Sequence, residues 1–204
     1  MDPIRILIVD DHAVLRMGLA SLLNTQKDLK VVADAENGED ALAKAAKHHP
    51  DLVIMDLMIP GMNGAEITRA LIERDSETKV LVLTSYSTSS GIAEALEAGA
   101  KGAILKNAAF QDITAAIREV AAGRSFLSEE IKRVLDEDPP IKPLTNRQKS
   151  VLALMVRGLS NPDMAKALGI SEDVVKDHVI AILQRLGAAN RTEAVSIAFR
   201  HHLI

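Results

Sequence analysis

Short apolar runs and longer segments of helical periodicity alternate along the first 122 residues of the chain. The runs are short and rich in β-branched residues, which is typical of buried strands; they cover residues 4–9, 29–33, 52–55, 80–83 and 103–105. The helical patterns between them cover residues 13–23, 39–48, 65–74, 91–98 and 110–121. These β-α units predict an α/β fold, in which a doubly wound sheet of five parallel strands carries helices on both faces.

The pattern changes after residue 123. Residues 124–143 combine acidic runs with Pro139-Pro140, which predicts a helical start followed by a stiff polar linker. Later residues show only helical patterns. Ser, Thr and Asn are favoured N-caps because their side-chain oxygens accept from free backbone N–H groups; they predict helix starts at Thr145, at Ser160 or Asn161, at Ser171 and at Asn190. The sequence thus predicts a first domain at 1–123, a linker at 124–143 and an all-α domain of four helices at 144–204.

Composition narrows the functional classes. The 204 residues are 48% hydrophobic and 25% charged, a balance typical of globular rather than disordered chains. Because cysteine is absent, disulfide scaffolds, zinc–thiolate sites and thiol nucleophiles are excluded. No apolar run approaches the ~18 residues that span a bilayer, and the N-terminus is unlike a signal peptide. We therefore expect a cytoplasmic protein with no membrane partner.

Charge is divided unevenly along the chain. Residues 1–139 carry 15 Lys and Arg against 23 Asp and Glu, a net charge of −8, whereas residues 140–204 carry 9 against 5, a net charge of +4. The basic tail favours an anionic partner such as nucleic acid. A chance excess in a short segment is the alternative, and charge alone does not decide between them.

Three carboxylates follow predicted strands. Asp10 and Asp11 come directly after the first strand, and Asp56 comes directly after the third. Because ligands collect at the carboxyl ends of parallel strands, we expect these side chains to converge. Clustered carboxylates repel one another unless a cation joins them, and hard oxygen ligands suit Mg²⁺. The sequence therefore predicts a magnesium site at this edge of the sheet.

Thr84 and Lys106 end the fourth and fifth strands at the same edge. A hydroxyl and an ammonium beside a metal-bound carboxylate can hold the oxygens of a phosphoryl group. Asp56 is then a candidate nucleophile that forms an aspartyl phosphate. Taken singly, each residue has an ordinary explanation as a cap, a turn residue or a solvated charge. Their joint placement at the ends of four strands favours the functional interpretation.

Motifs of this region resemble the receiver domain of two-component response regulators; they are Val9–His12, Met55–Gly64, Leu83–Ser85 and Lys101–Lys106. The resemblance spans about residues 4–122 and implies a flavodoxin-like fold. It implies that Asp56 accepts a phosphoryl group from a sensor histidine kinase, and that Thr84 and Lys106 bind the phosphoryl oxygens. It assigns Mg²⁺ to Asp11, Asp56 and the backbone carbonyl of Met58, with help from Asp10.

The third predicted helix of the tail is amphipathic. Its apolar stripe consists of Val175, Val179, Ile182, Leu183 and Leu186. Its opposite face carries Asp173, Lys176, Asp177, Ile180 and Gln184. With the preceding helix and the turn at Gly169-Ile170, it predicts a helix-turn-helix whose polar face enters the major groove of DNA. The alternative is an ordinary small bundle with a solvated polar face.

The tail resembles the LuxR-type DNA-binding domain; the matching segments are 144–148, 158–161, 165–171, 175–178, 186–187 and 190–195. The resemblance implies double-stranded DNA as a partner and a homodimer on activation. The predicted DNA contacts are Ser160, Asn161, Ser171, Val174, Lys176, Asp177 and Ile180. Val174 stands where the family often has Thr, so one phosphate contact is missing. Asp177 either accepts from a cytosine amine or repels the DNA backbone, and Ile180 packs either on a thymine methyl or against the receiver.

Together the two resemblances identify the chain as a NarL/FixJ-type response regulator, which is a transcription regulator and not an enzyme. A Mg²⁺ phosphohydrolase is disfavoured because no second acid or base is evident beside Asp56. One departure leaves a different function open. Receivers usually carry Tyr or Phe three residues before the signalling lysine, whereas this chain has Ala103, with Tyr86 as a candidate substitute. The alternative is a DNA-binding regulator whose receiver is uncoupled from phosphorylation.

Overall fold

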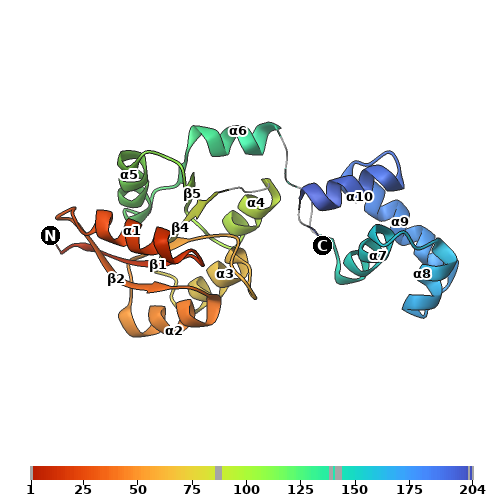
Figure 1. Cartoon of the computed structure of the whole chain (residues 1–204), viewed down its shortest axis with the longest axis horizontal. Coiled ribbons are helices and arrows are strands. Elements are labelled where there is room, and N and C mark those ends of the chain that lie inside the picture. The colour runs from red at the N-terminus through yellow and green to blue at the C-terminus, as the bar shows by residue number, and fades with distance from the viewer. Residues whose placement is uncertain (1, 86–88, 138–139, 141–143, 202, 204) are drawn as a thin grey trace. The chain divides into compact units, whose positions relative to one another are not determined.

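The structure is a computed structural model that describes residues 2–85, 89–137, 140, 144–201 and 203. The chain forms two compact units, one of residues 1–87 and 91–138 and the other of residues 88–90 and 139–204. The first unit contains a sheet covered by helices, and the second is built from helices (Figure 1). The predicted α/β fold followed by an all-α fold is confirmed.

The sheet of the first unit is parallel throughout, in the order β2-β1-β3-β4-β5-β6. Its strands are β1 (Ile4–Val9), β2 (Leu29–Ala35), β3 (Leu52–Met55), β4 (Lys79–Thr84), β5 (Gly102–Leu105) and β6 (Phe126–Leu127). The direction of strand order reverses between β1 and β3, which are hydrogen-bonded neighbours. In doubly wound sheets such a reversal opens a crevice at the carboxyl ends of the strands, so this order positions the candidate site.

Helices cover both faces of the sheet. α1 (Ala13–Leu23) and α5 (Phe110–Ala121) pack on one face, and α2 (Gly38–His48), α3 (Gly64–Arg74) and α4 (Ser89–Glu97) pack on the other. Strand side chains alternate between these two cores, as Ile8 and Val9 of β1 do. Because both faces of the sheet are buried, the strands are apolar at nearly every position. This is why they appear in the sequence as continuous apolar runs.

The prediction of five strands is wrong, because a sixth strand extends the sheet. β6 lies inside the segment predicted as a linker and pairs with β5. The N–H of Phe126 donates to the carbonyl of Lys101 at 2.9 Å, and the N–H of Ser128 donates to that of Ala103 at 3.2 Å. A strand of two residues is too short to show an alternating pattern, so it could not be predicted from periodicity.

Helix α6 (Glu129–Glu137) follows β6 and packs on the first unit. Ile131 is fully buried there, and the partly buried Val134 and Leu135 join the same core. These apolar residues recur at i, i+3 and i+4, one stripe of an otherwise charged helix. Helix α6 therefore belongs to the first compact unit. Pro139, Lys142 and Pro143 of the predicted linker lie outside the described residues.

The second unit consists of α7 (Asn146–Val156), α8 (Asn161–Leu168), α9 (Glu172–Leu186) and α10 (Arg191–Arg200). The predicted N-caps are confirmed, since each accepts a backbone hydrogen bond: Thr145, Ser160, Ser171 and Asn190. Gly169 ends α8 with a φ of 64°, which lets α9 start after a short turn. The buried core includes Val151, Leu152, Met155, Met164, Val175 and Ile182. None of the helices in the described part of the chain is long and apolar enough to cross a membrane.

Candidate functional site

The predicted charged residues of the first unit meet at the carboxyl ends of the strands. Asp10 follows β1, Asp56 follows β3 and Lys106 follows β5. The Lys106 Nζ lies 2.5 Å from Asp10 Oδ2 and 2.7 Å from Asp56 Oδ2. All three side chains are less than 10% exposed, at 4%, 4% and 9% for Asp10, Asp56 and Lys106. The lysine therefore holds two nearly buried carboxylates together.

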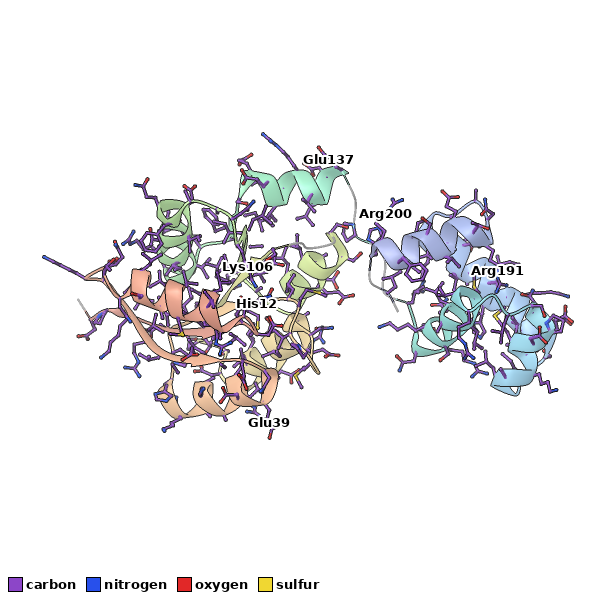
Figure 2. The ribbon with its side chains drawn as sticks, viewed as in Figure 1. His12, Glu39, Lys106, Glu137, Arg191 and Arg200 are labelled. Carbon is purple, nitrogen blue, oxygen red and sulfur yellow. The ribbon has the colours of Figure 1, made fainter. Side chains whose placement is uncertain are left out.

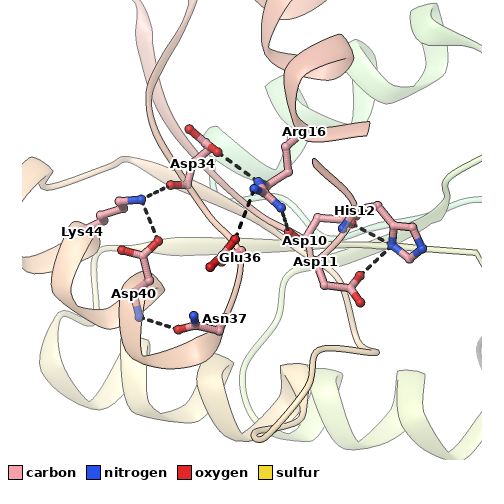
Figure 3. Close-up of polar contacts among 9 residues, drawn as sticks. All are labelled: Asp10, Asp11, His12, Arg16, Asp34, Glu36, Asn37, Asp40 and Lys44. Carbon is pink, nitrogen blue, oxygen red and sulfur yellow. Dashed lines mark hydrogen bonds and ion pairs between the residues drawn. The ribbon is translucent and has the colours of Figure 1, made fainter. Parts of the chain in front are cut away.

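Further oxygen and nitrogen donors surround this pair. Asp10, Asp11, His12 and Asp56 each offer one atom within 4.8 Å of the others. The Nδ1 of His12 lies 2.6 Å from Asp11 Oδ1 (Figure 3), and the N–H of His12 donates to Asp10 Oδ1 at 2.8 Å. His12 was not predicted as a site residue, although it directly follows Asp11 in the sequence. His12 and Lys106 are both labelled in Figure 2. The oxygen donors have the chemistry that a hard divalent cation requires.

Thr84 has an unusual environment. Its side chain is fully buried, and its Oγ1 forms no hydrogen bond with the described residues. Its own carbonyl accepts from the N–H of Lys106 at 2.9 Å, which joins the ends of β4 and β5. A buried hydroxyl without a partner costs about 1–3 kcal/mol, so a ligand oxygen that accepted from Thr84 would relieve this cost. The same threonine was predicted to bind phosphoryl oxygens.

The ionisation of this cluster follows from burial and charge. Burial raises the pKa of Asp56, the contact with the Lys106 ammonium opposes this rise, and the Asp10 carboxylate adds to it. Burial acts to lower the pKa of Lys106, but its hydrogen bonds to Asp10 and Asp56 outweigh that effect and raise the pKa. Lys106 thus stays charged at neutral pH. The carboxylates are held in place by an ammonium that an incoming group can share.

Backbone packing positions Asp56. A Cβ added at Gly64 would lie 2.3 Å from the carbonyl oxygen of Asp56 and 2.8 Å from the Cα of Leu57. The start of α3 therefore packs directly on the peptide that follows Asp56, and only glycine allows this approach. A capping box between Asn63 and Glu66 fixes this helix start. The Met58 backbone also hydrogen-bonds the Asp56 carboxylate, while the Met58 side chain is exposed.

Ala103, at the position where related domains carry an aromatic ring, is fully buried in β5. It pairs with Val82 on one side and with Leu127 on the other. Its position in the sheet is the one expected from the sequence. Tyr86, the candidate substitute for the ring, lies outside the described residues.

The second candidate site is the exposed side of α9. Val174 and Ile180 are 40% and 53% exposed. Asp177 is also exposed, and its carboxylate makes no hydrogen bond or ion pair with the described residues. Apolar and acidic side chains are therefore presented together to solvent on α9.

The remaining predicted DNA contacts are already engaged within the second unit. The Lys176 Nζ lies 3.3 Å from Asp173 Oδ1 and 3.6 Å from Glu172 Oε1. These contacts raise the pKa of Lys176. The hydroxyls of Ser160 and Ser171 accept from backbone N–H groups as helix caps. These serines therefore shape the helix starts, and Asn161 is the first residue of α8.

Comparison with known proteins gives two family matches. Residues 6–118 match the response regulator receiver domain, and residues 142–198 match the bacterial regulatory proteins of the luxR family. The response regulator protein VraR of Staphylococcus aureus strain Mu3 is 38% identical over 206 residues, covering 98% of this chain and 99% of VraR.

Two solved structures align with this chain over nearly its whole length. The response regulator ChrA of a heme-sensing two-component system is 36% identical, with a TM-score of 0.60 and full coverage of both chains. The response regulator RcsB in complex with DNA is 22% identical, with a TM-score of 0.70 over 97% of this chain and 98% of RcsB. At that identity RcsB supports the fold alone.

Proposed function

Because the chain belongs to the two-component response regulators that join a receiver domain to a luxR-type DNA-binding domain, we propose that it accepts a phosphoryl group on Asp56 and controls transcription by binding DNA. The observation that carries this proposal is the buried Asp10–Lys106–Asp56 contact, together with the Thr84 hydroxyl, which has no hydrogen-bond partner among the described residues. Such a site combines a nucleophile with two groups that bind phosphoryl oxygens. The donor is a phosphohistidine of a sensor histidine kinase.

In the transfer step, a carboxylate oxygen of Asp56 attacks the phosphorus of the phosphohistidine. The new P–O bond forms as the P–N bond breaks, and the bonding electron pair leaves with the imidazole of the kinase. The Lys106 ammonium then exchanges a carboxylate oxygen for a phosphoryl oxygen, and the Thr84 hydroxyl gains the acceptor that it lacks. The movement of Thr84 and Lys106 toward the phosphoryl group reports its presence to the rest of the domain.

The chemistry of the donors fits Mg²⁺. Asp11, Asp56 and the Met58 carbonyl would hold the ion, with Asp10 contributing to the negative field. When bound, Mg²⁺ neutralises charge that develops on the transferring phosphoryl oxygens. Asp10 and Asp56 directly follow β1 and β3, whose apolar side chains are packed into the two cores.

We assign double-stranded DNA to the exposed side of α9. Lys176 would contact a phosphate or guanine after leaving its carboxylate partners, Asp177 a cytosine amine, and Ile180 a thymine methyl. Val174 would lie against the backbone, and the helix starts at Ser160, Asn161 and Ser171 would direct N–H groups at phosphates. A homodimer on two half-sites and a cytoplasmic location complete the proposal. RcsB, whose fold is similar to that of this chain, has been solved in complex with DNA.

Ala103 favours a second candidate function, a DNA-binding regulator whose receiver is uncoupled from phosphorylation. Without a ring that moves with Thr84, the receiver would take up phosphate without passing a signal, and DNA binding would be constitutive. The two functions differ in a measurable way. In the first, phosphorylation changes assembly and DNA affinity, whereas in the second it changes neither.

Sedimentation velocity with and without Mg²⁺ and a small-molecule phosphodonor tests the proposal, with Asp56→Asn as control. We expect a monomer that becomes a dimer only when Asp56 is intact, together with tighter binding to duplex DNA. Stoichiometric labelling of Asp56→Asn would show that the site is assigned wrongly. Confirmed labelling of the unsubstituted chain with no change in mass or DNA affinity would favour the uncoupled regulator.

A further inference from the structure

A single arginine joins the acidic turn after β1 to the end of β2. Arg16 lies on α1, one turn after the start of the helix. Its Nη1 donates to the backbone carbonyl of Asp10 at 2.6 Å, and its Nε donates to Asp34 Oδ2 at 3.0 Å (Figure 3). Its Nη2 lies 3.9 Å from Glu36 Oε2. The side chain is only 11% exposed, so the guanidinium is held between these partners rather than extended into solvent.

The hydrogen bond from Arg16 to the Asp10 carbonyl restrains the backbone of the acidic turn. This carbonyl belongs to the peptide unit that joins Asp10 to Asp11, and that unit is planar. The Cα atoms of both residues lie in this plane, so a hydrogen bond to the carbonyl restrains the points from which both carboxylates branch. The peptide unit before Asp10 is restrained as well, since the Asp10 N–H donates to the Ala35 carbonyl of β2 at 3.1 Å.

The partner of Arg16 is itself anchored. The Lys44 Nζ on α2 donates to the backbone carbonyl of Asp34 at 2.5 Å and to Asp40 Oδ2 at 2.6 Å. Asn37 caps α2 by accepting from the N–H of Asp40 at 2.9 Å (Figure 3). The end of β2 is thus tied to the start of α2. Arg16 connects this rigid corner to the acidic turn.

We propose that Arg16 is a positioning residue for the Mg²⁺ site, because its guanidinium fixes the peptide unit that carries Asp10 and Asp11. The inference rests on the proposed function, which places Mg²⁺ at these carboxylates. A planar guanidinium can donate to the carbonyl and to the Asp34 carboxylate at once, whereas an ammonium is a point donor that cannot span both in this geometry. Positioning therefore depends on the shape of the arginine as well as on its charge.

Charge alone predicts the opposite effect. A cation beside a cluster of carboxylates repels Mg²⁺, so removing Arg16 would tighten Mg²⁺ binding if the residue acted only through its field. Removing a positioning group instead weakens binding, because the carboxylates are then free to turn away. The sign of the change separates the two roles.

The chain offers a matched control in Arg118 of α5. Its Nε lies 2.7 Å from Asp28 Oδ2, just before β2 begins, while Arg16 binds Asp34 near the end of that strand. Both arginines pair with an aspartate of the same strand region, but at opposite ends of the sheet. Arg118→Met thus removes the same charge and an ion pair without touching the acidic turn.

Isothermal titration of Mg²⁺ into the full unphosphorylated chain tests the proposal. We expect Arg16→Met to raise the Kd roughly tenfold or more, the range found for groups that orient metal ligands. Arg118→Met should leave the Kd within about twofold, the effect of a distant and screened charge. Arg16→Lys keeps the charge but not the double contact, so its Kd should also rise. In labelling with a phosphodonor, the Mg²⁺ concentration for half-maximal rate should rise while the rate at saturating Mg²⁺ changes much less.

A Kd that is unchanged or lower in Arg16→Met would overturn the inference. Circular dichroism and thermal unfolding check that this variant is folded; if it is not, Arg16→Lys decides, and an unchanged Kd there would overturn the inference equally. A chain without substitutions that binds no Mg²⁺ would overturn the proposed Mg²⁺ site along with it. If the unsubstituted chain binds Mg²⁺ and the Arg16 variants bind it with the same Kd, only the positioning role of Arg16 is rejected and the proposed Mg²⁺ site stands.

Discussion

Lys106→Met should destabilise the metal-free protein strongly, because it removes the cation between two nearly buried carboxylates. Asp10 and Asp56 are each 4% exposed at their side chains, and the Lys106 ammonium contacts both within 2.7 Å. Removing one partner of a buried ion pair costs 3–5 kcal/mol, and the position at the edge of the sheet favours the lower end, about 3 kcal/mol. That change lowers the ratio of folded to unfolded protein by roughly a hundredfold.

Urea unfolding in the presence of a chelator measures this loss, and Lys101→Met is the matched control. Lys101 is exposed and lies at the other end of β5, so its substitution should change stability by less than about 0.5 kcal/mol. Adding Mg²⁺ at about 100 times its Kd stabilises the folded state by about 2.7 kcal/mol, which should offset most of the deficit of Lys106→Met. If Lys106→Met in chelator is as stable as Lys101→Met, the cluster is not held together by this lysine and the argument fails.

Three further predictions follow from the same structure. Gly64→Ala should lower the free energy of unfolding by about 1–3 kcal/mol, because the new Cβ would meet backbone atoms. Gly18→Ala is the control: this glycine lies inside α1 with open space around it, so its substitution should raise the free energy of unfolding by up to about 1 kcal/mol. Thermal unfolding measures both. Burial raises the pKa of Asp56 in the folded state, so the folded state binds this proton more tightly than the unfolded state. The metal-free protein should therefore lose stability relative to Asp56→Asn as the pH rises from the ordinary carboxyl range through the raised pKa. A stability difference between the two proteins that does not change with pH contradicts this prediction. Asp177→Ala should bind non-specific duplex more tightly and lose about 1–3 kcal/mol of preference for cytosine at one position, as selection from randomised duplexes would reveal.

The strand ends were predictable because the sheet is buried on both faces. Apolar runs marked β1, β3, β4 and β5, and the polar residue after each run then had to lie at the same edge. That rule brought Asp10, Asp56 and Lys106 into one prediction, and the structure places them in contact. Helix starts were predictable for a related reason, since a capping side chain leaves a local signature.

Features that depend on distant neighbours were not predictable. Arg16 looks like any exposed helical arginine in the sequence, and only the fold brings the end of β2 to it. That the Thr84 hydroxyl has no hydrogen-bond partner in the described part of the chain is likewise a property of packing, not of the residue type. β6 was missed because two residues carry no period, and its pairing is set by the exposed edge of β5.

The surroundings of Ala103 give a structural reason for its small side chain. β6 pairs with β5 at this residue, and the Ala103 carbonyl accepts from Ser128 at 3.2 Å. Ala103 also belongs to the core that contains Ile131, the fully buried residue of α6. An aromatic ring at position 103 would compete with α6 for space in this core, since protein interiors hold few voids. The lack of a ring therefore follows from the docking of α6, and it does not by itself require a receiver that has lost its signal.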